Sequence, residues 1–147
     1  MKREIKFRGY NLKNKKWLYG YYLVNRGKHF IAEEGLQPPG MTWEDFEVDP
    51  ESVGQFVGTY KGVHIFEGDI VKVTETDGWK STYTGKVVYD KMNCRFVVEV
   101  TNPYPMIIPI TGEKQTDQIG MGCYCEYYYQ YEVIGNEYEE KLKISNP

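Results

Sequence analysis

Polar and apolar residues alternate at the start of the chain, with the period of a strand that buries one face. Within residues 3–10, Ile5 and Phe7 fall on one face and charged residues fall on the other. A polar turn at residues 11–16 follows, and residues 17–24 form a second run that is rich in strand-forming side chains. The pattern predicts a β-hairpin with several lysines at its turn.

This periodicity is lost over residues 25–52. Residues 25–40 look like a loop or ragged hairpin, which ends in a Pro-Pro-Gly sequence that neither a helix nor a central strand tolerates. Thr42 is a candidate N-cap with Asp45 three positions later, so one short helical turn is expected there. A second brief turn is expected to open at Pro50.

Beyond residue 53 the chain becomes a series of short β-runs separated by turns that are rich in glycine, asparagine and aspartate. The expected strands are Val53–Thr59, Val63–Phe66, Ile70–Thr74, Tyr83–Tyr89, Arg95–Val100, Met106–Ile110 and Tyr127–Ile134. Short strands at this spacing predict a small barrel or sandwich. The expected fold is therefore mainly β, with at most one or two short helices.

Length and composition fit a folded domain. The chain has 147 residues, 27% of them charged and 16% aromatic, and disordered chains are poor in aromatic residues. No run approaches the roughly 18 apolar residues of a membrane helix. The first ten residues lack the apolar stretch of a signal peptide. A cytoplasmic protein without a membrane segment is expected.

The net charge of −3 conceals a strong asymmetry along the chain. Residues 1–28 carry a net charge of +8, and residues 29–70 carry a net charge of −8. A basic arm of this kind can bind nucleic acid. Because the two blocks cancel, the preferred interpretation is that residues 2–28 and 33–51 pair with each other, within a chain or between subunits.

The sequence Glu67-Gly68-Asp69 raises the possibility of a carboxylate pair for metal binding or acid–base chemistry. Side chains two positions apart around a turn point away from each other, and no histidine or third acid adjoins them. The preferred interpretation is a structural turn. Glycine supplies an unusual φ, aspartate bonds nearby backbone, and Ile70 begins a strand.

The sequence gives little support for a metal site or for a catalytic nucleophile. Three cysteines, an odd number, do not suggest a disulfide framework, and two distant histidines do not complete a zinc site, so no metal or cofactor is expected. A hydrolase would have to gather at least three of a small set of reactive side chains: His64, Glu67, Asp69, Cys94 and Cys125.

Aromatic residues crowd two segments. The first contains Trp17, Tyr19, Tyr21 and Tyr22, and Tyr127, Tyr129 and Tyr131 share one face of the second. Tyrosines suit protein interfaces and cores because they are apolar with a polar tip. The alternative is that these rings stack single-stranded bases while basic residues contact phosphates.

Three stretches of the sequence resemble a known protein family in their specific residues, beyond the general pattern of strands and turns. Residues 3–10 (REIKFRGY) with residues 14–17 (NKKW) resemble the start of the YopX family of phage and prophage proteins. Residues 53–58 (VGQFVG), leading to residues 65–71 (IFEGDIV), are similar to a further family phrase, and residues 131–139 (YEVIGNEYE) are similar to its closing strand.

This resemblance implies an SH3-like, partly open barrel at residues 59–147, an N-terminal β-hairpin-rich extension at residues 1–58, and assembly into a homo-oligomer. It carries over no catalytic residue. The expected function is a non-enzymatic module that self-associates and binds an unidentified host or phage protein. The interaction candidates are Lys13, Lys15, Lys16, Trp17, Tyr19, Tyr127, Tyr129 and Tyr131. The alternative is a nucleic-acid binder that uses the same three lysines with Arg26, Lys28, Trp17 and Tyr19.

Overall fold

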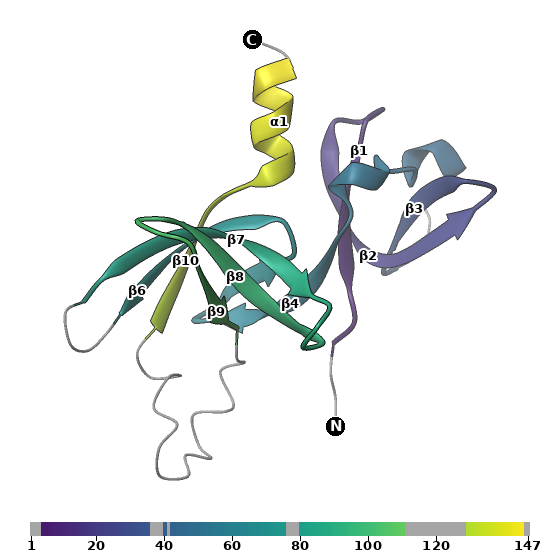
Figure 1. Ribbon diagram of the computed structural model, residues 1–147. Coiled ribbons are helices and arrows are strands. Elements are labelled where there is room, and N and C mark those ends of the chain that lie inside the picture. Colours follow the sequence, from purple (N-terminus) through teal and green to yellow (C-terminus); the bar gives the residue numbers. More distant parts are fainter. Residues whose placement is uncertain (1–3, 36–39, 41, 76–79, 111–128, 146–147) are drawn as a thin grey trace. The chain divides into compact units, whose positions relative to one another are not determined.

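The computed structural model describes residues 4–35, 40, 42–75, 80–110 and 129–145. The chain divides into two compact units, Met1–Phe56 and Val57–Pro147. Both units are built from antiparallel strands, which confirms the mainly β fold (Figure 1).

The N-terminal unit contains a meander of three antiparallel strands: β1 (Phe7–Asn11), β2 (Lys16–Asn25) and β3 (Lys28–Glu33). The first two form the predicted hairpin, and they pair Tyr10 with Trp17. The edge of β1 that faces away from β2 pairs with the first residues of β4 (Gly54–Tyr60).

Residues 25–40 were expected to form a loop or ragged hairpin, and the structure has the hairpin, with a regular strand at residues 28–33 that pairs with β2. Arg26 and Gly27 have φ values of 50° and 74°, as in a two-residue turn of the type that joins twisted strands. Ile31 is fully buried, and Tyr22 lies opposite it on β2. The turn was missed because arginine occupies the position where such turns usually carry asparagine or aspartate.

Residues 42–52, called here the covering segment, cross one face of this meander. They contain two 3-10 turns, η1 (Trp43–Asp45) and η2 (Pro50–Ser52), at the two places where short turns were expected. The segment bonds β3 at one end, through the Val48 N–H and the His29 carbonyl (2.8 Å), and β1 at the other, through the Asp49 N–H and the Tyr10 carbonyl (2.9 Å).

Val48 is the apolar centre of the covering segment. It packs with Leu18 and Ile31 in the core of the N-terminal unit. Gly9 lies directly beneath it, because a Cβ at position 9 would come within 2.8 Å of the Val48 side chain. The missing side chain of Gly9 is what allows the segment to lie this close to the sheet.

The C-terminal unit has a five-stranded antiparallel sheet in the order β10-β6-β7-β8-β9 (Figure 1). These strands are β6 (Asp69–Glu75), β7 (Thr82–Asp90), β8 (Arg95–Asn102), β9 (Met106–Pro109) and β10 (Tyr129–Asn136). Strand β5 (Val63–Phe66) adjoins β4 and contributes Ile65 to a core with Val71, Val87 and Val98. Barrel closure of the SH3 type stays a prediction.

The C-terminal segment ends in a helix. Residues 131–139 are similar to the family's closing strand, but the strand ends at Asn136 and residues 137–145 form a helix, α1 (Glu137–Ser145). The Asn136 side chain accepts a bond from the Glu139 N–H (2.8 Å) and so caps the first turn. Tyr138 anchors the helix, being only 8% exposed.

Candidate functional site

The Glu67-Gly68-Asp69 turn is a structural corner between β5 and β6. Gly68 has φ 89°, in the left-handed region that favours glycine. The carboxylate of Asp69 is 1% exposed, and its Oδ2 accepts a bond from the Phe66 N–H at 2.8 Å. The carboxylate therefore closes the turn rather than facing solvent.

The same corner receives two other parts of the chain. The Gly68 N–H donates to the Val87 carbonyl of β7, and the Gly68 carbonyl accepts from the Glu137 N–H at the start of α1, both at 2.9 Å. Asn136 lies opposite Asp69 in the pairing of β10 with β6. The IFEGDIV and YEVIGNEYE phrases, about 65 residues apart in sequence, are thus neighbours in space.

Three of the side chains that a hydrolase would need have different local surroundings in the structure. His64 bonds Thr59 between β5 and β4, and Cys94 is an exposed thiol in the β7–β8 turn. Asp69 is buried at the corner, and Cys125 lies outside the described residues. Among the side chains that the structure describes, no group of three or more His, Cys, Asp or Glu is arranged to hold a metal ion.

One face of the β1–β2 hairpin carries a row of aromatic residues. Arg8 lies opposite Tyr19, and Tyr10 lies opposite Trp17, so all four project from the same face. The Arg8 guanidinium lies 4.9 Å from the Trp17 ring centroid, and Tyr10 meets Trp17 edge to face at 5.5 Å. Alternation along β2 adds Tyr21 to this face. We call these five residues the aromatic face.

Two of the three tyrosines of the aromatic face are exposed. Tyr19 is 45% exposed and Tyr21 is 58% exposed, although both belong to a regular strand. The Tyr21 hydroxyl donates to Glu34 at 3.3 Å. Two large rings held at strand spacing and open to solvent form a preorganised contact surface.

The structure separates the three candidate lysines from Trp17 and Tyr19. Lys16 lies opposite Asn11, on the other face of the hairpin, and Lys15 occupies the turn with φ 53°. Lys13 reaches the covering segment, where its Nζ lies 3.0 Å from Asp45 Oδ1. The aromatic and lysine candidates therefore do not form one surface.

The candidate tyrosines of β10 contribute to the C-terminal core. Tyr129 and Tyr131 are half-buried and pack against the cluster around Val71 and Val73. Tyr131 also meets Tyr60 edge to face at 5.4 Å. Tyr127 lies outside the described residues.

The oppositely charged sequence blocks meet within the N-terminal unit. Lys13 pairs with Asp45, and Lys28 Nζ lies 3.8 Å from Glu47 Oε2. The basic and acidic blocks therefore form ion pairs within one chain. At least one lysine of the hairpin turn, Lys13, is directed to an acid rather than to solvent.

The side chain of Asn11 joins the hairpin turn to the covering segment. This side chain is fully buried, and its Nδ2 group donates to the carbonyls of Glu44, Asp45 and Glu47 at 2.9–3.1 Å. Its Oδ1 accepts from the Asn14 N–H at 2.6 Å. One amide thus fastens the covering segment to the hairpin turn.

Asp45 is the electrostatic centre of the same region. The Thr42 backbone N–H (2.8 Å), Lys13 and the Asn14 amide (3.3 Å) all favour its charged form. Together these contacts hold the pKa of Asp45 well below its ordinary value, with the Thr42 bond contributing most.

This lowered pKa predicts how stability depends on pH. Ionised Asp45 stabilises the fold above its unfolded pKa, near 4, and the stabilisation is lost as pH falls toward the lower folded pKa. The difference in Tm between wild type and Asp45→Asn should be greatest at neutral pH and shrink below about pH 4. Thermal melts followed by circular dichroism at several pH values measure it, with exposed Glu44→Gln as the control. A difference that stays constant down to about pH 2 would contradict the assignment.

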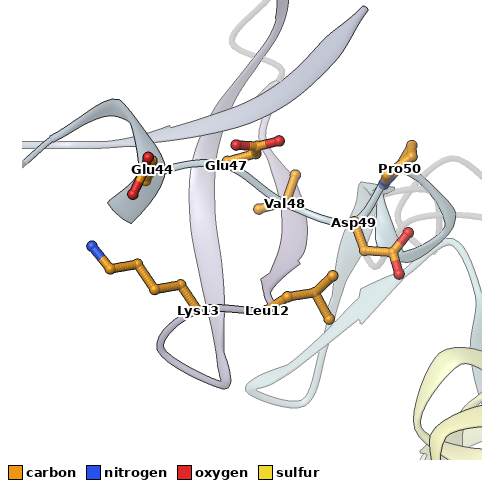
Figure 2. A pocket seen from close by; sticks show the side chains of 7 residues that line it. All are labelled: Leu12, Lys13, Glu44, Glu47, Val48, Asp49 and Pro50. Atoms are coloured by element: carbon orange, nitrogen blue, oxygen red, sulfur yellow. The ribbon is translucent and has the colours of Figure 1, made fainter.

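A depression of about 440 Å³ opens where the hairpin turn meets the covering segment (Figure 2). Leu12 and Lys13 form one side of it, and the stretch from residue 44 to residue 50 forms the other. The lining residues are Leu12, Lys13, Glu44, Glu47, Val48, Asp49 and Pro50. Three carboxylates against one ammonium group give this lining a net charge of −2 at neutral pH.

Sequence reasoning missed several residues of these surfaces. Arg8 and Tyr10 were read as ordinary strand residues, although the register of a tight hairpin would have placed them beside Trp17 and Tyr19. The role of Asn11 had no local signal, because its partners lie 33–36 residues away in the sequence.

The fold and these surfaces define a small, mainly β protein of two units, with a structural corner in one, and an exposed aromatic face and an acidic depression in the other. The chain belongs to the YopX protein family, whose model matches residues 6–143. This match confirms the resemblance found in the three sequence phrases. Neither the comparison with curated proteins nor that with solved structures gave a match. Within the described part of the chain, no helix is long and apolar enough to cross a membrane.

Proposed function

We propose that this YopX family member is a non-enzymatic protein-interaction module that forms a homo-oligomer through its aromatic face. The observation that carries the proposal is the row of Trp17, Tyr19 and Tyr21 on one side of β2, with both tyrosines well exposed on a regular strand. Tyrosine, tryptophan and arginine are the residue types that contribute most to protein interfaces.

The geometry favours protein contact for two reasons. The rings lie on a hydrogen-bonded sheet, so binding costs little conformational entropy. Arg8 is already stacked on Trp17 and is 7% exposed, which leaves a mainly apolar surface with polar tips. A second copy of the same face is a partner of matching chemistry, and self-complementary surfaces are the rule in two-fold dimers.

A nucleic-acid-binding role is the second candidate. Exposed tyrosines at strand spacing beside an arginine resemble a platform on which successive bases stack. This role is less favoured because the basic residues are poorly placed to contact phosphates beside the aromatic face. Lys13 and Lys28 pair with acids, and Lys16 projects from the opposite face. Titration of labelled single- and double-stranded DNA and RNA at two salt concentrations tests this role, since phosphate contacts must weaken with salt.

The test of self-association is the double substitution Tyr19→Ser/Tyr21→Ser. It removes the two exposed rings without touching the core, so we expect the assembly to dissociate toward the 17.2 kDa chain with little change in Tm. Mass is measured by light scattering over a series of protein concentrations.

The matched control is Val24→Ser. Val24 lies on the same strand, is 54% exposed and projects from the opposite face. We expect this variant to keep the wild-type mass. Equal masses for the control and the double variant at every concentration would remove the aromatic face from the proposal.

A further inference from the structure

The depression in the N-terminal unit combines an apolar wall with a carboxylate rim. Leu12 is 57% exposed at its edge, and the exposed Pro50 adds aliphatic surface, whereas Val48 is buried. Glu44, Glu47 and Asp49 follow one another along the covering-segment side of the depression (Figure 2). A volume of about 440 Å³ lies within the range of pockets that hold small ligands or single side chains.

The cations nearest the depression only partly neutralise it. Lys13 directs its ammonium group to Asp45, which is not one of the lining residues. Glu47 meets Lys28 at 3.8 Å, and both side chains of that pair are well exposed, which makes the contact weak. The negative field of the rim therefore remains available to an incoming cation.

We propose that this depression receives lysine or arginine side chains from an extended basic segment of a protein partner. Such side chains carry an aliphatic stem that packs on apolar surface and a charged head that remains at a polar rim. Leu12 and Pro50 suit the stem, and Glu44 and Glu47 suit the head. This charge complementarity also disfavours acidic partners and nucleic acid at the same place.

The inference adds a second partner to the proposed interaction role. Its lining residues belong to the hairpin turn and the covering segment, and none belongs to the aromatic face. Self-association and basic-segment binding can therefore each fail independently of the other.

The experiment uses a fluorescein-labelled peptide of alternating lysine and serine, and a matched peptide with glutamate in place of lysine. We expect fluorescence anisotropy to show binding of the lysine peptide alone, at low salt. Glu44→Lys/Glu47→Lys should weaken that binding by about tenfold or more, because the rim charge is reversed. The variant Glu44→Gln/Glu47→Gln should weaken it by less.

The matched control is Glu33→Lys. Glu33 is an exposed acid of the same unit that does not line the depression, so its reversal changes net charge without changing the site. We expect binding within about threefold of wild type. Absence of lysine-peptide binding, or equal losses per reversed charge at positions 33 and 44, would overturn the proposal. So would a fall in oligomer mass in Lys15→Ser/Lys16→Ser, because it would identify the occupant as a second copy.

Discussion

Replacing Asp69 by alanine is expected to lower the Tm of the protein by about 10 °C while leaving self-association intact. The carboxylate is buried, and its loss leaves the Phe66 N–H without this acceptor. A buried donor deprived of its partner costs about 1–3 kcal/mol, and about 4–8 °C in Tm follows each kcal/mol in a domain of about 60–100 residues, the size range of the unit Val57–Pro147. Circular dichroism melts measure the shift, and light scattering measures the mass.

Two controls sharpen this prediction. Asp69→Asn keeps one acceptor oxygen in nearly the same place, so the loss of Tm should be smaller than for alanine. Glu67→Ala removes the other acid of the turn, which is only half-buried, and should also cost less. If Asp69→Ala kept its Tm but lost partner binding, the corner would be a binding site and its structural assignment would be wrong.

Asn11→Ala is expected to cost about 2–3 kcal/mol, because the side chain is buried and serves four backbone groups. Its removal leaves the carbonyls of Glu44, Asp45 and Glu47 without their shared donor and detaches the covering segment. The binding of the lysine peptide should fall with it, since the same segment forms one side of the depression. Thermal melts and peptide anisotropy measure the two effects.

The variant Asn11→Asp distinguishes the role of the Oδ1 acceptor from that of the Nδ2 donor. It keeps an acceptor for the Asn14 N–H but presents a carboxylate to three carbonyl oxygens, so it should destabilise at least as much as alanine at neutral pH. Asn14→Ala, which loses only an exposed contact with Asp45, should be nearly neutral. If Asn11→Asp left the stability unchanged, the role given to the Nδ2 group would be contradicted.

The strands could be predicted from the sequence because alternation and glycine turns are local properties. The runs beginning near residues 53, 63, 70, 83, 95 and 106 correspond to β4–β9 within a few residues.

The two missed elements had weak local signals. Strand β3 is short, and charged residues flank its apolar centre, so its burial depends on pairing with Tyr22 and contact with the covering segment. Helix α1 is polar and follows directly from a strand. Asn136 with Glu139 was an available capping signal, and lysine lies in the last turn.

The surfaces could be predicted only in part. Trp17 and Tyr19 were recognised because aromatic crowding is visible along one strand. Their separation from the lysines depends on register, and the depression depends on contacts between residues more than 30 positions apart. Such long-range placement cannot be read from periodicity.

Sedimentation equilibrium of the wild-type chain over a wide concentration range tests the central claim most directly. Self-association through the aromatic face predicts a mass above 17.2 kDa that rises with concentration toward a whole multiple of the chain, and that falls in Tyr19→Ser/Tyr21→Ser. A wild-type mass of 17.2 kDa at every concentration would contradict the claim.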